Sequence, residues 1–340
     1  MTTALSKMKA LRLDRADGPG GLSLADVDIP TPARGEVRVA LKAASINHRE
    51  LWITRGQYPG MQLPCTLGCD GAGVIEAVGE GVDASRVGSA VMLYPGLNWG
   101  PDLRFPAADF GLLGMPGPGT LAQFVCVADA NALDKPDYLS FEEAAAVPLA
   151  ALTAWRGLVT KAGLTSSENL LITGAGGGVA TFALQIAVAL GAAVFVTSSH
   201  AETLEHAIKL GVREGFNYRD EGWPKALRKA AGGVDVAFDG APAAAFAGYS
   251  RALNRGARVV IYGSTAGLQF PCSAADLFLK NLNIMGTNVG TRQELQLLLA
   301  FLQQHQIRPQ IERTFTLTDA TRALAHLEGA HGFGKVVVKI

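Results

Sequence analysis

The segment from Asn169 to Gly191 constrains the fold of this chain more than any other. It starts with an apolar run, continues through a cluster of glycines and ends in a long, alanine-rich apolar stretch without proline. This order is typical of a strand, a tight turn and a helix. We expect Gly174 to supply the turn, Gly177 to let the backbone approach a ligand, and Ala180 to let the helix pack closely on the strand.

The glycine turn predicts a dinucleotide-binding site, because the exposed N–H groups at a helix N-terminus attract a pyrophosphate. A purely structural turn before a helix would give the same letters, so the motif alone leaves that alternative open. The next apolar run, Ala192 to Thr197, supports the dinucleotide site. It ends at Ser198, where a parallel β-α-β unit places the residue that meets the adenosine ribose.

Length and composition limit the classes of protein that this chain can belong to. Its 340 residues exceed one ordinary core, and 49% hydrophobic with 18% charged residues indicate a folded, soluble protein. A formal net charge of +0 offers no attraction to nucleic acid or to an anionic membrane. No apolar run could span a bilayer, residues 1–10 lack a signal-peptide core, and the four cysteines are scattered. We therefore expect a cytoplasmic protein with neither nucleic acid nor membrane as partner.

The texture of the sequence changes twice along the chain. Short strands separated by turn signals fill residues 1–135, and strands alternate with helices over residues 136–289. Such alternation predicts a parallel, doubly wound sheet. Residues 290–340 return to the β-rich texture, so we expect an α/β protein in which a nucleotide-binding domain interrupts a β-rich catalytic domain. Within the first domain, Gly96 to Thr120 is rich in Gly and Pro and is predicted to be a long loop.

Several stretches resemble the medium-chain dehydrogenase/reductase superfamily, especially its zinc-free, quinone-oxidoreductase-like and enoyl-reductase-like branch. They are ASINHRELW at 44–52, GCDGAGVIEAVG at 68–79, AAAVPLAALTAW at 144–155, the glycine turn, and GFGKVVVKI at the C-terminus. The resemblance covers nearly the whole length. It implies a GroES-like β-rich domain split around a Rossmann domain, with a nicotinamide cofactor between them. It also implies a small electrophilic substrate and a homodimer or homotetramer.

The resemblance also bears on zinc. In the zinc-dependent alcohol dehydrogenases of the superfamily, two cysteines and one histidine hold the catalytic metal. Their places correspond here to Asn47, Cys69 and Leu149, two of which cannot bind zinc in that way, whereas an open catalytic zinc site needs three N, S or O donors. We therefore predict no catalytic metal.

Two further points concern metals. The loop Gly96 to Thr120 takes the place of the family's structural-zinc lobe but contains no cysteine, so we expect it to be metal-free. An alternative stays open, in which nearby side chains regroup into a new metal site. The candidates for it are His48, Glu50, Cys69 and Asp70.

The choice of nicotinamide depends on the end of the second Rossmann strand. An acidic residue there, as in NAD-dependent members, would repel a 2′-phosphate, but this chain has Ser198, Ser199 and His200. Hydroxyls and an imidazole can donate to phosphate oxygens, so we predict NADP(H). Tyr218 matches a family tyrosine that lines the phosphate pocket, whereas Thr203 replaces a lysine that relatives often use. The alternative is that the serines and the histidine only cap the following helix.

Other contacts with the cofactor should lie beyond the carboxyl ends of the strands, where ligands bind in open α/β sheets. Lys335 is a further candidate for the cleft. The remaining predicted cofactor-binding residues are Gly174, Gly177, Gly178, Val179, Tyr262, Gly263, Ser264 and Asn288.

Without a metal, the easiest acceptors are those that spread the incoming negative charge themselves, such as quinones and α,β-unsaturated carbonyls. We expect Asn47 to bind the substrate oxygen, Thr153 to lie near the nicotinamide, and Tyr58 to act as proton donor or pocket wall. The predicted function is an NADPH-dependent, zinc-independent reductase of such acceptors. Two alternatives remain: an alcohol dehydrogenase or aldehyde reductase with a rearranged metal site, and a nicotinamide-binding protein with little turnover.

Overall fold

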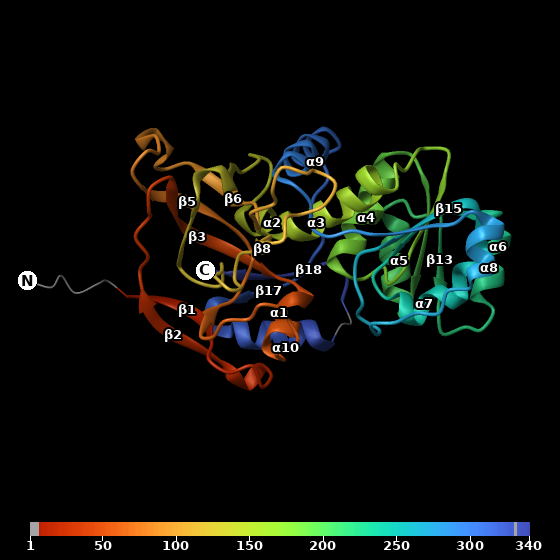
Figure 1. Cartoon of the computed structure of the whole chain (residues 1–340), viewed down its shortest axis with the longest axis horizontal. Coiled ribbons are helices and arrows are strands. Elements are labelled where there is room, and N and C mark those ends of the chain that lie inside the picture. The colour runs from red at the N-terminus through yellow and green to blue at the C-terminus, as the bar shows by residue number, and fades with distance from the viewer. Residues whose placement is uncertain (1–6, 330–331) are drawn as a thin grey trace, which may run out of the picture.

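The computed structural model describes residues 7–329 and 332–340. These residues form an elongated molecule with a β-rich part at one end and an α/β part at the other (Figure 1). Both halves of the predicted fold class are therefore present.

The β-rich part contains a three-stranded and a seven-stranded sheet. In the first, β1 (Lys7–Leu13) pairs antiparallel with β2 (Leu22–Asp28) and with β4 (Cys65–Thr66). The second has the order β10-β6-β5-β3-β18-β17, and β9 also pairs with β3. Its strands are β3 (Glu36–Ile46), β5 (Asp70–Val78), β6 (Ala90–Leu93), β9 (Phe124–Ala128), β10 (Ala132–Asp134), β17 (Ile311–Thr316) and β18 (Lys335–Lys339).

The C-terminal strand β18 lies between β17 and β3 in this sheet. It runs antiparallel to β3, with Val336 opposite Ile46. Residues from the two ends of the chain therefore share one sheet, and Lys335 is placed beside the end of β3. Helix α10 (Ala320–Gly329) connects β17 to β18 within the β-rich part.

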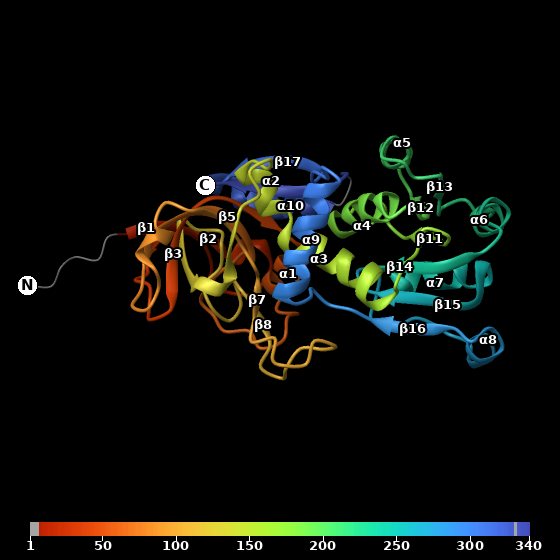
Figure 2. The same cartoon turned by 90° about the horizontal axis from the view of Figure 1, so that it is seen from above.

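The α/β part is built on a six-stranded parallel sheet of order β13-β12-β11-β14-β15-β16, which Figure 2 shows in sequence across the sheet. Its strands are β11 (Asn169–Ile172), β12 (Ala193–Ser198), β13 (Glu214–Asn217), β14 (Val234–Asp239), β15 (Leu253–Ile261) and β16 (Asn283–Gly286). The order reverses between β11 and β14, and ligands bind at such a switch point, beyond the carboxyl ends of the strands. The connecting helices are α4 (Gly178–Ala189), α5 (Ala201–Lys209), α6 (Trp223–Ala231), α7 (Pro242–Tyr249) and α8 (Ala274–Lys280).

Three helical segments join the two parts: α2 (Phe141–Ala146), α3 (Pro148–Trp155) and the π-helix η4 (Arg156–Lys161), with α9 (Arg292–Gln304) packed beside them. The alanines of α2 and α3 belong to a buried cluster that includes residues of both large sheets. Helix α3 begins at Pro148, because proline is well suited to the first helical turn, where its missing N–H has no intrahelical partner.

Other boundaries also differ from the sequence-based expectations. The helix predicted for 243–253 ends at Tyr249, because Leu253 already pairs with Val234 in the parallel sheet. Helix α8 was not predicted, and the predicted loop 96–120 holds two short paired strands, β7 (Gly96–Leu97) and β8 (Gly111–Leu112). Residues 47–56, which the sequence suggests as one or two helical turns ending at a glycine, contain helix α1 (His48–Thr54). The short 3-10 turns are η1 (Pro19–Gly21), η2 (Ala84–Arg86), η3 (Asp129–Asn131), η5 (Ser250–Ala252) and η6 (Leu317–Asp319).

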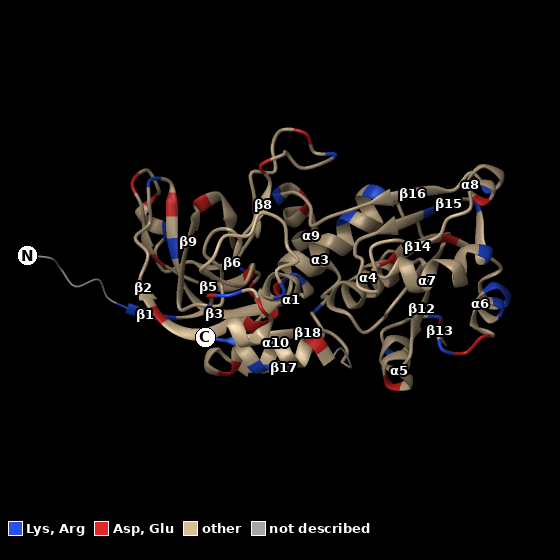
Figure 3. Ribbon diagram, turned by 60° about the horizontal axis from the view of Figure 1, so that its bottom comes forward, with Lys and Arg blue, Asp and Glu red and all other residues tan. Residues whose placement is uncertain are grey.

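Arg156 holds the long loop between β7 and β8. Its buried guanidinium donates to Glu294 at 2.5 Å and to the carbonyls of Leu103 and Arg104 at 2.9 and 2.8 Å. Its carbon Cζ also lies 4.8 Å from the centre of the Trp99 ring. Figure 3 shows the loop projecting beyond β8 with charged residues at its tip. In the described ranges, no helix is long and apolar enough to cross a membrane.

Candidate active site

Helix α1 begins directly after strand β3, and Asn47 is its N-cap residue. The backbone N–H of Asn47 donates to the carboxylate of Glu50 at 2.8 Å, which is the backward half of a capping box. Glu50 is fully buried and also accepts a bond of 2.9 Å from Arg49. Burial raises the pKa of Glu50, while the Arg49 guanidinium and the Asn47 N–H act against that rise. The start of α1 is thus fixed by a buried carboxylate.

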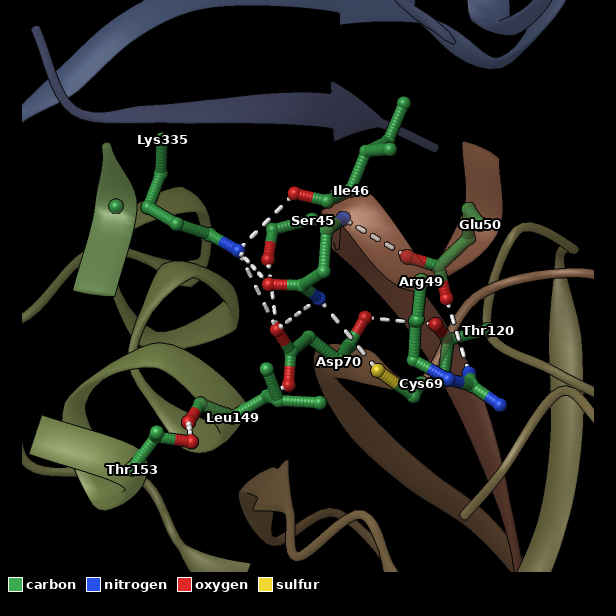
Figure 4. Close-up of polar contacts among 12 residues, drawn as sticks. Ser45, Ile46, Arg49, Glu50, Cys69, Asp70, Thr120, Leu149, Thr153 and Lys335 are labelled. Carbon is green, nitrogen blue, oxygen red and sulfur yellow. Dashed lines mark hydrogen bonds and ion pairs between the residues drawn. The ribbon is translucent and has the colours of Figure 1, made fainter. Parts of the chain in front are cut away.

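The carboxylate of Asp70, the first residue of β5, is surrounded by four donor groups (Figure 4). One carboxylate oxygen, Oδ2, accepts from Ser45 Oγ at 3.0 Å and from Asn47 Nδ2 at 2.8 Å. The other, Oδ1, accepts from the backbone N–H of Leu149 at 2.9 Å. The ammonium of Lys335 lies 3.5 Å from Oδ2. A buried carboxylate is stable only with such partners, and here strands β3 and β18, the N-cap of helix α1 and helix α3 supply them.

Lys335 links this network to the parallel sheet. Its ammonium donates to the carbonyl of Ile46 at 3.1 Å and to Oδ1 of Asn47. Its aliphatic stem lies against the start of helix α4, because a Cβ atom added to Gly178 would come within 2.5 Å of Lys335 Cδ. Only 3% of the residue is exposed. One side chain therefore spans the distance from the glycine turn to Asn47.

The three positions that correspond to zinc ligands in related enzymes converge on this network. The amide nitrogen of Asn47 is 3.5 Å from Cys69 Sγ, and Leu149 donates its backbone N–H to the neighbouring Asp70. Cys69 is fully buried, and burial together with Asp70 and Glu50 holds its pKa well above the ordinary value. Zinc binds cysteine as the thiolate, so metal binding at Cys69 would have to release the thiol proton.

The residues present do not fit a catalytic zinc ion. Glu50 is engaged with Arg49, and Asp70 is engaged with Lys335. Over residues 7–329 and 332–340, no group of three or more His, Cys, Asp and Glu side chains is placed to hold a metal. The candidates for the alternative metal site, His48, Glu50, Cys69 and Asp70, therefore do not form such a group.

The other two predicted catalytic residues contact different members of this region. Thr153 is buried in α3 and donates its hydroxyl to the carbonyl of Leu149 at 2.7 Å, so it is tied to the residue that contacts Asp70. Tyr58 is half-buried, and the Arg49 Cζ atom lies 4.9 Å from the centre of its ring. The structure thus joins Thr153 to the Asp70 network and Tyr58 to Arg49.

The glycine turn sits at the carboxyl end of β11, with Gly174 and Gly177 exposed. Gly174 has φ +66, which favours glycine, whereas Gly177 has φ −68, which any residue adopts. A Cβ at Gly177 would meet nothing nearer than 3.8 Å, so no contact within the protein requires glycine there. Open space before the N-terminus of α4 fits the approach of a pyrophosphate, and Gly178 and Val179 form the first turn of that helix.

The predicted ribose-phosphate residues lie together at the ends of β12 and β13. Ser198 accepts a bond of 3.2 Å from the backbone N–H of His200, and Tyr218 donates to Ser199 Oγ at 3.0 Å. A surface pocket of about 530 Å³ adjoins them. Glu202 was missed from the sequence, although its place in the first turn of a helix beside the predicted pocket was a usable signal. The pocket is lined by Ser199, His200, Ala201, Glu202 and Thr203.

The remaining predicted cofactor residues follow strands β15 and β16, on the other side of the switch point. The Tyr262 ring stacks on Phe238, with 4.3 Å between ring centres, and covers Gly240. Burial raises the pKa of Tyr262. Gly263 follows, and Ser264 and Asn288 are exposed. All lie beyond the carboxyl ends of parallel strands, at the same edge of the sheet as the glycine turn.

Comparisons with known proteins agree with this architecture. The profile of the alcohol dehydrogenase GroES-like domain matches residues 33–137, and that of the zinc-binding dehydrogenase matches residues 178–304. The chain is 33% identical to the zinc-type alcohol dehydrogenase-like protein YogA of Leptosphaeria maculans, over 94% of each chain. It is 29% identical to the quinone oxidoreductase of Mus musculus, over 98% of each chain.

A solved structure matches equally broadly. The crystal structure of an NAD-dependent alcohol dehydrogenase, 36% identical in sequence, superposes with a TM-score of 0.93 and covers 98% of this chain and 100% of that one. Together with the GroES-like and Rossmann parts described above, these matches confirm the resemblance seen in the sequence. The chain is an oxidoreductase that belongs to the medium-chain dehydrogenase/reductase superfamily.

Proposed function

We propose that this protein is an NADPH-dependent, zinc-independent reductase of quinones or α,β-unsaturated carbonyls. The observation that carries the proposal is the buried pair of Lys335 and Asp70, which stands among the positions that hold the catalytic metal in zinc-dependent relatives. An acceptor that spreads negative charge over a conjugated system suits a site without a metal donor set.

A nicotinamide cofactor fits the residues present. The open space before α4 would hold the pyrophosphate, and the residues at the end of β12 would meet the adenosine ribose. When bound, NADPH supplies the hydride. We assign to Asn47, which lies between Cys69 and Lys335, the role of holding the substrate oxygen. Thr153, one turn along α3 from Leu149, would help to keep the reacting groups together.

The preference for NADPH rests on Ser198, Ser199 and His200, which carry no negative charge towards a 2′-phosphate. Glu202 acts against it, because its carboxylate lines the same pocket. This residue and the similarity to the NAD-dependent alcohol dehydrogenase of known structure favour a second candidate, an NAD-dependent alcohol dehydrogenase. We place that candidate second because the donor set does not fit zinc.

A panel of acceptors tests the proposal. Oxidation of NADPH is followed at 340 nm with 1,4-benzoquinone, an enone, an enal and a simple ketone, with and without a chelator. We expect turnover of the conjugated acceptors that the chelator leaves unchanged. Activity that appears only on addition of zinc, or with the ketone alone, would favour the alcohol dehydrogenase. Tight NADPH binding with negligible turnover of all four acceptors would point to a binding protein instead.

Assembly and location complete the proposal: a homodimer or homotetramer in the cytoplasm. Exposed apolar side chains on α8, Phe278 and Leu279, lie beside β16, which pairs only with β15 among the described strands and so forms an edge of the parallel sheet. Light scattering with size-exclusion chromatography would measure the mass, and a monomer at micromolar concentration would contradict an oligomer.

A further inference from the structure

The Lys335 ammonium donates two hydrogen bonds, to the Ile46 carbonyl and to Oδ1 of Asn47, and forms an ion pair with Oδ2 of Asp70 at 3.5 Å. An ammonium carries three N–H donors, and these three acceptors surround this one. Each acceptor comes from a different residue, and all are buried. In this arrangement Lys335 can act on a reaction through these partners.

Asn47 is the partner through which Lys335 can influence a bound substrate. Its carbonyl oxygen is held by Lys335, and one N–H of its amide donates to Asp70 at 2.8 Å. The other N–H faces Cys69 Sγ at 3.5 Å, and a thiol sulfur is a weak acceptor. This contact is the weakest in the network. An approaching substrate oxygen could replace the sulfur at little cost to the rest.

The charge of Lys335 strengthens that donor. Hydrogen bonds in a chain polarise one another, so an amide whose oxygen binds an ammonium donates more strongly through its nitrogen. Burial increases the effect, because few water dipoles screen the ammonium. Asp70 neutralises Lys335 in the resting protein, which allows a cation to persist at a site that is almost closed to water.

We propose that Lys335 is a positioning residue for the reduction, which fixes and polarises the Asn47 amide so that its second N–H stabilises the substrate oxygen as negative charge develops there. The inference rests on the proposed function and deepens it. Bound NADPH would supply the hydride and would be oxidised to NADP⁺. An enone that accepts this hydride at its β-carbon would gain a C–H bond and become an enolate as its C=C electrons shift, and a proton from water would neutralise the product.

The position of Lys335 against Gly178 supports a competing role. Its stem lies at the N-terminus of α4, where the cofactor pyrophosphate would bind, so Lys335 could instead serve as a phosphate contact. The two roles make different demands on kinetics. A phosphate contact governs the affinity for NADPH, whereas a positioning residue governs kcat and the binding of oxyanions.

The test compares three variants of the full chain: Lys335→Met, Lys335→Met combined with Asp70→Asn, and Lys339→Met as a control. The double variant removes both charges and so avoids leaving a buried carboxylate unpaired. Lys339 is the exposed lysine on the same strand, and its ammonium lies 3.6 Å from Glu142. Circular dichroism first shows that each variant is folded.

For Lys335→Met and for the double variant we expect kcat with an enone to fall on the order of 10- to 100-fold, somewhat less than the loss of a direct oxyanion donor. The fall should be smaller with 1,4-benzoquinone, which stabilises its own charge. The Kd for NADPH, measured by fluorescence, should stay within about twofold. The control should match the parent protein in each measurement.

Binding of 4-nitrophenolate gives a readout that does not depend on turnover. This anion is coloured and unreactive, and it mimics the oxygen of an enolate. We expect its Kd to rise about tenfold when Lys335 is replaced, with NADP⁺ present or absent. A folded double variant with parental kcat and phenolate affinity would overturn the inference, and so would a raised Kd for NADPH with unchanged kcat.

Failure of the proposed function gives a different pattern. In that case the parent protein itself reduces none of the conjugated acceptors, and replacement of Lys335 leaves the affinity for 4-nitrophenolate unchanged. A parent protein that turns over the enone together with a variant that is equally active would sink the inference alone.

Discussion

The ammonium of Lys335, at the start of the last strand, lies 3.5 Å from the Oδ2 atom of Asp70, at the start of β5. The two residues are separated by most of the chain, including the whole parallel sheet. Neither side chain has more than 3% of its surface exposed. The pair closes the split β-rich part at the place where the candidate active site begins.

We predict that Asp70→Asn destabilises the protein by about 3 kcal/mol, because it leaves a buried ammonium without its counter-charge. Urea unfolding followed by circular dichroism measures the change. Adding Lys335→Met to the same protein should recover part of the loss, since the double variant buries no charge at this point. A single variant within about 0.5 kcal/mol of the parent would show that the pair does not contribute to stability.

The two glycines of the turn offer a matched comparison. Gly174→Ala should lower the free energy of unfolding by about 1–2 kcal/mol, because residue 174 has φ +66. Gly177→Ala should leave stability unchanged, since φ is −68 and a Cβ would meet no atom within 3.8 Å. It should raise the Kd for NADPH about tenfold, however, because the new methyl group enters the space left for the pyrophosphate. Equal NADPH affinity in the parent and Gly177→Ala would place the cofactor elsewhere.

Cofactor preference should respond to charge at the end of β12. Ser198→Asp places a carboxylate where the 2′-phosphate is expected, so kcat/KM for NADPH should fall at least about tenfold while NADH becomes the better cofactor. Glu202→Gln is the opposite change in the same pocket and should improve NADPH. Steady-state measurements of kcat/KM with NADPH and with NADH test both variants. A parent protein that already prefers NADH would contradict the assignment of NADPH.

Arg156→Met should detach the loop between β7 and β8. The change leaves the buried Glu294 without its charged partner and removes the donors to two loop carbonyls, with an expected cost of about 3–5 kcal/mol. Limited chymotrypsin digestion should then cut at Leu103 or Phe105, which are already exposed. The control is Arg104→Met, which changes an exposed residue of the same loop. This variant should resist chymotrypsin digestion as the parent protein does. Unchanged digestion of Arg156→Met would mean that other contacts hold the loop.

Stability should fall as the pH rises from about 9 to about 11, in part because of Cys65. Burial raises the pKa of this thiol to about 11, with Arg49 acting against the rise. In that window the unfolded chain has lost the Cys65 proton while the folded chain retains it, so rising pH favours unfolding. Urea midpoints measured at several pH values should fall less steeply for Cys65→Ala. Parallel curves for the two proteins would show that Cys65 does not contribute.

Local sequence patterns were sufficient for much of the fold. The glycine turn, the apolar strands and the alternation of strands with helices depend on neighbouring residues, and the structure has the parallel sheet that they predicted. Boundaries failed where a tertiary contact decided them. Leu253 ended its predicted helix by pairing with Val234, and α8 lacks a strong periodic pattern in seven residues.

The candidate site was partly accessible from the sequence. Asn47, Cys69 and Leu149 could be named from the resemblance, and the structure brings them to one network. The central roles of Asp70 and Lys335 could not be derived, because nothing in either local sequence shows that the two charges meet. Strand pairing of β18 with β3 creates that meeting.

The sequence by itself thus determined the kind of fold, the place of the glycine turn and the absence of the family's zinc-ligand pattern, since each depends on residue types within a short stretch. Only the tertiary structure decided which side chains lie among the positions that correspond to the zinc ligands of related enzymes. A buried charge is tolerated where an opposite charge reaches it, and which residues reach one another is a property of the assembled sheet rather than of any segment.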